Sequence, residues 1–333
     1  MSRSSRPSAI LCYDTALHLS VHSPNIQDVA AFLAQHLGAI DESSLERVGH
    51  GEWSKAYVFR TADGRDLVAR FSQFDDDFLK DQRARGFIQG RIPIPEILEI
   101  RTAFDGFLAV SSRAYGTFLE DRDANALQRL LPALLATLDA VRQADISNTT
   151  GFGLWRGSDG TAPFTTWHEA LLRIATQPPS ARLSGWREAL AQNAEAQRVF
   201  EAAFIHMQRL VPACPNERHL IHSDLLNFNV LVQGDRISAL LDWGSSMYGD
   251  FLWDLAWLTF WQPWYTAWST LDIRQAARDH YAATGLDVPN FDARLRCYEI
   301  AIGLDGLAYQ TWANRPSTEW AWTARRLESL IPA

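Results

Sequence analysis

The sequence predicts an α+β fold of two lobes, a small N-terminal lobe built on an antiparallel sheet and a larger, mainly helical C-terminal lobe. At 333 residues the chain exceeds the roughly 250 to 300 residues at which a single hydrophobic core stops growing. Short β-type runs are concentrated between residues 40 and 112, and long stretches of helical periodicity follow from Leu119 onward. Together these observations favour two packed lobes.

The N-terminal lobe begins with a predicted helix over residues 24–37. Ser23 and Pro24 precede apolar residues at helical spacing, and Gly38 follows them. Beyond this helix, turn residues separate short β-type runs. We expect strands over residues 45–48, 56–60 and 67–71, a helix over 78–89, and a closing hairpin of 97–100 with 107–111. The strands should form an antiparallel meander.

The C-terminal lobe is predicted to be mostly helical, with one compact β region at residues 229–242. Helical stretches are expected over residues 127–144, 167–176, 186–208 and 294–313, and an exposed Gly-, Ser- and Asp-rich loop over 151–163. Residues 251–268 are strongly apolar, but Asp254, Gln262 and Pro263 interrupt them. They predict a buried helix and its exit, with no membrane span. The chain therefore divides into an N-terminal extension (1–22), a first lobe (23–113) and a second lobe (114–333).

Composition excludes several classes of partner. The formal net charge of -8 leaves no basic surface of the kind that neutralises nucleic-acid phosphates. An acidic balance fits a cationic small-molecule ligand, although it also simply favours solubility. The three cysteines, Cys12, Cys214 and Cys297, are scattered and form no metal-binding pattern, so a reducing cytoplasm is expected.

One polar segment carries the strongest chemical signal. His222 opens a run that contains Asp224 and Asn229, a β-hairpin follows, and its far end presents Asp242. Phosphoryl transfer needs a carboxylate that accepts a hydroxyl proton and oxygen ligands for magnesium. Asp224 can accept the proton, and Asn229 and Asp242 can offer the oxygens. Taken singly, such residues often only shape turns, but their spacing after a small β lobe favours chemistry.

This pattern resembles the catalytic loop and metal-binding Asp of the protein-kinase-like fold. The His-x-Asp opening and the Asp242-Trp243 pair look like the aminoglycoside phosphotransferase family. The resemblance implies transfer of a phosphoryl group from ATP or GTP, with Mg²⁺, to an antibiotic hydroxyl. It makes Asp224 the catalytic base, Asn229 and Asp242 magnesium ligands, and His222 an orienter of the loop. The first lobe would bind nucleotide, and the second would carry the catalytic loop and acceptor site.

Further segments resemble the branch of this family that phosphorylates hygromycin B. They occur in that branch's order and extend the similarity over roughly residues 27–331. The segments are residues 67–71, 92–96, 151–153, 165–167, 260–264 and 302–305. The resemblance therefore implies an aminoglycoside kinase that confers antibiotic resistance, with hygromycin B as the first substrate to consider.

The expected nucleotide site departs from protein kinases at two places. Gly51 is kept in the glycine loop, but Ser54 stands where a third glycine is usual, and a plain hairpin turn is the alternative. Arg70 occupies the strand position of the phosphate-binding lysine, and it keeps the charge with a wider, planar group. Asp81 is the candidate carboxylate partner of Arg70. The hinge at Arg113 and Ala114 should hold adenine through backbone groups.

A polycationic acceptor rich in hydroxyls calls for carboxylates and flat apolar walls. The helical lobe after Asp242 offers candidates for both, although the tryptophans could instead fill the core and the acids face solvent. The predicted substrate-binding residues are Asp305, Trp264, Trp261, Asp254 and Glu299.

Two alternatives to an aminoglycoside kinase stay open at this point. Fold alone does not exclude a metabolic kinase for choline, a sugar or an amino alcohol. A non-catalytic kinase-like binding module is the other alternative, and Arg70 and the altered glycine loop favour it. Intact Asp224, Asn229 and Asp242 oppose it. We expect a monomeric cytoplasmic enzyme.

Overall fold

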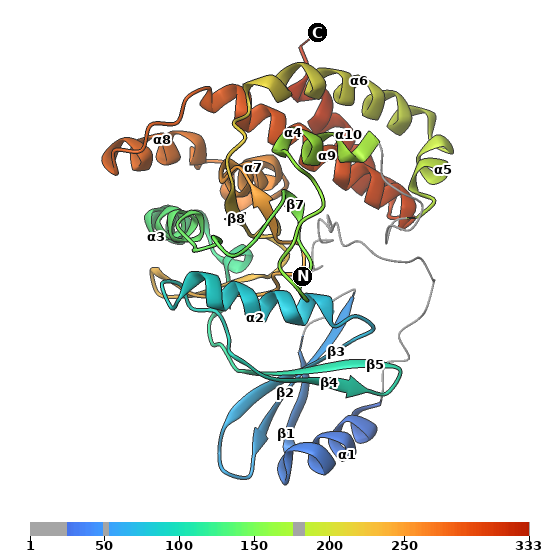
Figure 1. Ribbon diagram of the computed structural model, residues 1–333, viewed down its shortest axis with the longest axis vertical. Helices are drawn as coiled ribbons and strands as arrows, with labels where there is room; N and C mark the ends of the chain where they lie inside the picture. The colour runs from blue at the N-terminus through green and yellow to red at the C-terminus, as the bar shows by residue number, and fades with distance from the viewer. Residues whose placement is uncertain (1–24, 49–52, 176–183, 333) are drawn as a thin grey trace.

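The computed structural model describes residues 25–48, 53–175 and 184–332. A twisted sheet with helix α1 forms one end of the molecule, and a larger, mainly helical body forms the other (Figure 1). This is the two-lobed α+β arrangement that the sequence predicts.

The first lobe contains a five-stranded antiparallel sheet in the order β1-β2-β3-β5-β4. Two further sheets of three strands each lie in the second lobe, in the orders β10-β9-β6 and β7-β11-β8. The first-lobe strands are β1 (Ile40–Val48), β2 (Ser54–Thr61), β3 (Asp66–Ser72), β4 (Ile97–Ala103) and β5 (Gly106–Ser112). The second-lobe strands are β6 (Thr117–Phe118), β7 (Gly153–Leu154), β8 (His219–Ile221), β9 (Val230–Gln233), β10 (Arg236–Leu240) and β11 (Met247–Gly249).

Helix α9 is the centre of the second lobe, because α5, α6, α7 and α10 all pack against it. Its buried positions go almost all the way round, as expected for a helix enclosed by others. The helices are α1 (Ile26–Leu37), α2 (Asp76–Ile88), α3 (Ala124–Arg142), α4 (Trp167–Leu172), α5 (Trp186–Ala191), α6 (Ala194–Leu210), α7 (Leu252–Trp261), α8 (Ile273–Ala283), α9 (Phe291–Trp312) and α10 (Ser317–Leu330). Among the described residues, none of these helices has both the length and the apolar character needed to cross a membrane.

Helix α2 follows β3 in the first lobe but packs with the second. The sheet and α1 share one hydrophobic core, which includes Val29, Leu33 and Phe71. Ala84 and Ile88 of α2 belong instead to the large core of the helical lobe. In Figure 1, α2 lies between the sheet and the helical body. The helix is therefore part of the second lobe's packing.

Polar contacts fix α2 to two loops of the second lobe. The Gly157 N–H donates to Asp76 Oδ1 at 2.7 Å, and Arg83 Nε donates to Gly157 O at 2.5 Å. Lys80, only 4% exposed, donates from Nζ to Gly244 O at 2.7 Å. Gly244 lies two residues beyond Asp242, so α2 is tied directly to the segment that carries the predicted metal ligand.

Two expectations for the second lobe are wrong in detail. Residues 151–163 do not form an exposed loop, because Phe152, Leu154 and Trp155 are buried in the large core and Gly153 begins β7. The described part of the second lobe contains two small sheets, and the expected β region at 229–242 is only the β9–β10 hairpin of one of them. The other strands, β6, β7, β8 and β11, are not predicted because they are too short to show an alternating pattern.

Helix boundaries also differ where polar side chains interrupt apolar periodicity. The predicted helix over residues 186–208 breaks into α5 and α6, because Asn193 caps α6 by accepting the Ala196 N–H at 3.0 Å. The predicted helix from Trp167 ends as an α-helix at Leu172 and continues as a 3₁₀ turn to Ala175. The α7 prediction is confirmed, since every residue of this helix is buried.

Candidate active site

A polar loop between β8 and β9 carries the residues expected to perform chemistry. Ser223, Asn227 and Phe228 adopt left-handed backbone conformations with φ of 65°, 75° and 68°. Such angles cost about 1 to 3 kcal/mol each for residues other than glycine and persist only where surrounding contacts impose them. Despite the polar sequence of the loop, Asp224 is only 2% exposed. Hydrogen bonds that the loop backbone donates to Asp254 and Glu120 help to fix this conformation.

The Asp224 carboxylate is oriented by two asparagines. Asn227 Nδ2 donates to Asp224 Oδ1 at 2.6 Å, and Asn229 Nδ2 donates to Oδ2 at 3.1 Å and to the Asp224 backbone oxygen at 2.8 Å. Burial raises the pKa of Asp224 well above its usual value, and the nearby charge of Asp242 raises this pKa further. The carboxylate is thus fixed in direction and inclined to take up a proton.

His222 braces this loop as a neutral imidazole. Its Nε2 lies 2.9 Å from the Leu241 oxygen, and its Nδ1 accepts the Asp224 N–H at 3.3 Å. This pattern fits the tautomer with the proton on Nε2. Burial lowers the pKa of His222 to about 4. The geometry therefore supports the orienting role expected of His222, which joins the Asp224 loop to the residue before Asp242.

Asn229 precedes strand β9, and Asp242 lies two residues beyond strand β10, so the two residues flank the β9–β10 hairpin. The Leu241 N–H donates to the Asn229 backbone oxygen at 2.8 Å. The amide nitrogen of Asn229 points at the Asp224 loop, so its Oδ1 faces the other way. Burial raises the pKa of Asp242 to about 6, with a further contribution from Asp81. Hard oxygen atoms among mutually repelling carboxylates suit Mg²⁺, so this donor set fits the expected metal.

Arg70 on β3 forms an ion pair with Asp81 on α2, the partner that the sequence suggests. Asp81 also accepts the Trp243 N–H at 2.8 Å, next to Asp242. The Arg70 guanidinium lies close enough to Asp242 to oppose the rise in the pKa of that carboxyl. The sheet, α2 and the segment that carries Asp242 therefore meet around Arg70.

The other expected nucleotide contacts that the structure describes lie at the two ends of strand β3. Gly51 falls outside the described residues. Ser54 begins β2 and pairs with Ser72 on β3. Arg113 follows β5, where its N–H donates to the Asp66 oxygen at 3.2 Å, and Ala114 leads on toward β6. Ser54 and the hinge are thus placed at opposite ends of the Arg70 strand.

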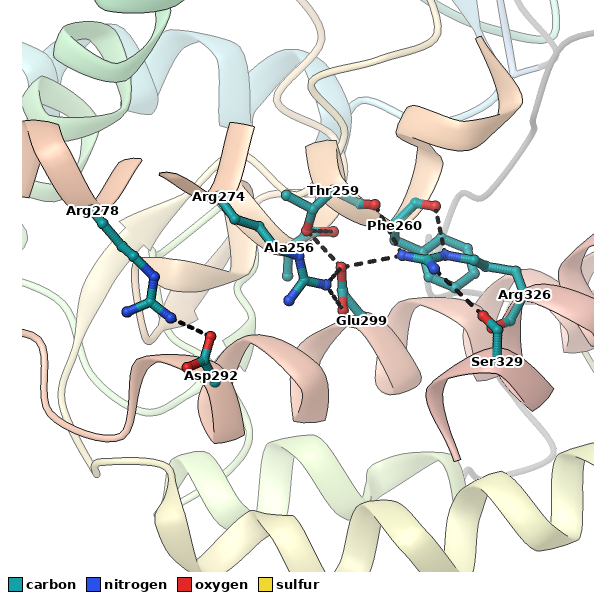
Figure 2. Close-up of polar contacts among 9 residues, drawn as sticks. All are labelled: Ala256, Thr259, Phe260, Arg274, Arg278, Asp292, Glu299, Arg326 and Ser329. Carbon is teal, nitrogen blue, oxygen red and sulfur yellow. Dashed lines mark hydrogen bonds and ion pairs between the residues drawn. The ribbon is translucent and has the colours of Figure 1, made fainter. Parts of the chain in front are cut away.

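Two carboxylates expected to bind the acceptor are engaged elsewhere. Asp254 uses both oxygens to accept the backbone N–H groups of His222 and Ser223, at 2.9 and 2.8 Å. It therefore anchors the start of the catalytic loop. Burial raises its pKa to about 7. Glu299 is fully buried and lies between Arg274 and Arg326, as Figure 2 shows. Neither carboxylate faces solvent, which corrects the sequence-based expectation.

The remaining acceptor candidates divide between core and surface. Asp305 is 4% exposed and bound to the equally buried Arg173 at 2.7 Å. Trp261 is 1% exposed and stacks on Trp322. Asp305 and Trp261 therefore belong to the protein core. For Trp261 this is the alternative stated above, in which the tryptophans fill the core. Trp264 is only half-buried and meets Trp322 edge to face, so it alone of this set keeps an accessible ring.

Three residues near Asp224 were missed by sequence reasoning. Asn227 is the closest donor to Asp224, and it could have been noticed as a second Asn in the motif. Glu120 reaches the loop from the segment after the hinge, where its Oε1 accepts the Phe228 N–H at 2.7 Å. Tyr265 lies near enough to Glu120 and Asp224 that their charges, after burial, raise its pKa. No sequence pattern marks the last two, because they converge only in the fold.

Sequence comparisons with known proteins match this chain to phosphotransferases. A family model described as the phosphotransferase enzyme family matches residues 44–291. Hygromycin-B 4-O-kinase of Escherichia coli is 31% identical over 305 residues, which cover 91% of this chain and 84% of that protein.

Solved structures of phosphotransferases and kinases also align with this chain. A thermostable mutant of aminoglycoside phosphotransferase APH(4)-Ia, in a ternary complex with AMP-PNP and hygromycin B, aligns with a TM-score of 0.78 at 29% identity, over 91% of this chain and 97% of that one. Amicoumacin kinase hAmiN, bound to AMP-PNP, Ca²⁺ and Ami, aligns with a TM-score of 0.65 at 13% identity, over 94% of this chain and 96% of that one, which shows the shared fold alone. With the Asp224 loop, Asn229, Asp242 and the Arg70–Asp81 pair in place, this chain belongs to the phosphotransferase enzyme family and has its two-lobed, protein-kinase-like fold.

Proposed function

We propose that this protein transfers the terminal phosphoryl group of ATP to a hydroxyl of an aminoglycoside, hygromycin B before others, and so inactivates the drug. One observation carries the proposal: Asp224, Asn229 and Asp242 converge beside the Arg70–Asp81 pair. The 31% identity to Hygromycin-B 4-O-kinase supports the choice of substrate. An added phosphate dianion would spoil the fit of a polycationic antibiotic to RNA.

Asp224 is the proposed general base. Its two oxygens are held by Asn227 and Asn229, so the carboxylate cannot turn away from an acceptor hydroxyl placed against it. A buried carboxylate with a raised pKa accepts the hydroxyl proton more readily than a solvated one would. Most of the remaining acceleration comes from holding the hydroxyl in line with the terminal phosphate.

Asn229 Oδ1 and the Asp242 carboxylate are the proposed Mg²⁺ ligands. The bound ion would neutralise charge on the phosphate oxygens. Arg70 adds a fixed positive charge on the sheet side, and Asp81 holds it in place. Residues 23–113, with Gly51, Ser54, Arg113 and Ala114, would hold the nucleotide, and residues 114–333 would hold the acceptor.

The proposed acceptor site lies on the Asp224 side of the second lobe. Trp264 offers a partly exposed ring, and Tyr265 lies close to Asp224. The net charge of -8 favours a cationic substrate. We further propose that the protein is a monomer. We also propose that it is cytoplasmic, since ATP is abundant in the cytoplasm and Cys214 and Cys297 are free thiols.

The decisive experiment is a transfer assay with [γ-³²P]ATP against hygromycin B, other aminoglycosides, choline and simple sugars, with the product mass and position determined. Asp224→Asn keeps the size of the side chain but removes the base, so kcat should fall by about 10² to 10⁴-fold. Nucleotide affinity should be unchanged. Asp235→Asn, in the exposed β9–β10 turn, is the matched control and should behave as wild type.

Two results would refute the proposal. Phosphorylation of choline or a sugar, with no turnover of aminoglycosides, would establish a metabolic kinase. Ligand binding without any phosphoryl transfer, or near-normal transfer by Asp224→Asn, would refute the assigned chemistry.

A further inference from the structure

Glu120 connects the segment after the hinge to the catalytic loop. It lies in the 3₁₀ turn Leu119–Asp121, a few residues beyond Ala114. Its Oε1 accepts the backbone N–H of Phe228 at 2.7 Å, although the two residues are distant in sequence. Its Oε2 is buried and has no hydrogen-bond partner among the described residues. Burying a carboxylate oxygen without a hydrogen-bond partner costs free energy of folding.

The bond from Glu120 falls on the most strained part of the loop. Asn227 and Phe228 are consecutive left-handed residues, and a bulky residue such as Phe rarely adopts this conformation. A backbone N–H bonded to a carboxylate is held about twice as strongly as one bonded to a neutral acceptor. Glu120 is therefore well placed to stabilise the Asn227–Phe228 conformation.

Phe118 supports the same loop from the same segment. Its ring meets the Phe228 ring edge to face, with centroids 5.1 Å apart. The strand β6 that contains Phe118 pairs with β9, so that Phe118 lies opposite Leu231 just after the loop. Residues 117–120 thus contact the Phe228 ring, the Phe228 backbone N–H and strand β9, which follows the loop.

The strained pair matters because Asn227 orients Asp224. Asn227 Nδ2 donates to Asp224 Oδ1 at 2.6 Å while the Asn227 backbone is left-handed, so the two features occur together. Release of the Phe228 N–H would let the pair relax and would turn Asn227 away. The chain of contacts runs from Glu120 through the Phe228 N–H and Asn227 to the base.

We propose that Glu120 is a positioning residue for phosphoryl transfer, which holds Asn227 against Asp224 through the backbone N–H of Phe228. This inference rests on the proposed function and extends it to a residue outside the catalytic motif. Glu120 touches neither nucleotide nor acceptor in this scheme, so its loss should lower kcat and leave KM for both substrates nearly unchanged.

The test compares Glu120→Ala with Glu120→Gln, and Asp121→Ala serves as the matched control. Asp121 is the neighbouring acid in the same turn and is exposed. Glu120→Ala should lower kcat for hygromycin B phosphorylation by at least about tenfold, the ratio expected for a lost hydrogen bond to a charged group. Glu120→Gln should recover most of this loss, because its amide oxygen can accept the same N–H. Asp121→Ala should match wild type.

A double mutant locates the effect. In an Asn227→Ala background, Glu120→Ala should lower kcat by less than about twofold further, because residues that act through one another are not additive. Equal and independent losses would overturn the proposed chain of contacts. A rise in acceptor KM with unchanged kcat would assign Glu120 to substrate binding and would also overturn it.

A structural measurement decides the proposal independently of activity. Hydrogen–deuterium exchange of a peptide spanning residues 225–232 should be faster in Glu120→Ala than in wild type or Glu120→Gln, with thermal unfolding used to confirm that each variant folds. Unchanged exchange would refute the positioning role. If wild type modifies no aminoglycoside, the proposed function fails, and the exchange result still decides what Glu120 does.

Discussion

The buried imidazole of His222 illustrates how single residues set the conditions under which this site forms. His222 bonds the Leu241 oxygen on one side and the Asp224 N–H on the other, and only the neutral ring can do both. Its pKa falls to about 4 because burial disfavours the charged ring. In the unfolded chain the ring has its ordinary pKa of about 6.5. The unfolded state therefore takes up a proton first as the pH falls.

This difference predicts a loss of stability in mild acid. Since the unfolded state binds more protons between pH 6.5 and pH 4, the free energy of unfolding decreases as the pH falls through that window. The contribution of His222 should be about 2 kcal/mol between pH 7.5 and pH 5. Urea unfolding of wild type and His222→Gln at these two pH values measures it.

The comparison isolates His222 from its neighbours. The pKa of Asp254 is raised to about 7, so its protonation favours the folded state as the pH falls and opposes the effect of His222. Both proteins contain Asp254, and its contribution cancels in their difference. Equal pH dependence in the two proteins would contradict the assignment of a neutral, buried His222.

At this scale the sequence predicts local chemistry well and distant contacts poorly. Asp224, Asn229 and Asp242 are recognisable because they belong to one loop and hairpin, whose spacing is visible along the chain. Asp254 and Glu299 have the right charge in the right region, but their partners are backbone N–H groups and arginines brought close only by folding. Residue type alone does not reveal which acids reach solvent.

Helix α2 is the element whose placement matters most for the nucleotide site. It carries Asp81, the partner of Arg70, and it contacts the second lobe closely at Gly157. A Cβ atom at Gly157 would lie 2.5 Å from the Asp76 oxygen and 2.7 Å from Leu79 Cβ. Only glycine permits this approach, so residue 157 fixes how near α2 lies to the body.

Gly157→Ala is therefore expected to destabilise the protein by about 1 to 3 kcal/mol, because α2 must move away. The shift should also disturb Asp81 and raise KM for ATP. Gly86→Ala is the matched control on the exposed face of α2, where a Cβ would meet nothing within 4 Å. That change should stabilise the helix by up to about 1 kcal/mol. Thermal unfolding and ATP kinetics of the pair test the prediction, and equal behaviour would contradict it.

Element prediction succeeds where periodicity is long and fails where strands are short. The first-lobe strands and helices α3 and α9 follow clear patterns and lie close to their predicted positions. Strands β7 and β11 contain too few residues to show alternation, and buried Phe152 and Trp155 are hidden in a segment that reads as a loop. Their burial depends on packing against distant residues.

At the scale of the whole molecule, the proposed nucleotide site joins both lobes. Arg70 comes from the sheet, Asp81 from α2, and Asp242 from the second lobe. A ligand held between Arg70 and Asp242 should stabilise the folded state of both lobes together, since it binds only when they are assembled.

Magnesium and ATP at about 100 times their dissociation constant should raise the free energy of unfolding by about 2.7 kcal/mol. Asp242→Asn should lose most of this gain, as should wild type treated with EDTA, because the nucleotide then lacks its metal bridge. Scanning calorimetry with and without ligand measures both effects. A full ligand-induced gain in Asp242→Asn would show that Asp242 is not a metal ligand.

The packing of α2 with the helical body also bears on how this protein could be recombined with its relatives. A chimaera cut at the hinge would separate Ala84 and Ile88 from their core and Lys80 from the Gly244 oxygen. Crossover points on either side of α2, near Phe74 and Glu96, and a third after β5 would exchange the sheet strands while this helix kept its core contacts. The Arg70–Asp81 pair would then join residues from the two parents. The exchangeable module is thus the bare sheet with α1, which is smaller than the lobe that a ribbon drawing suggests.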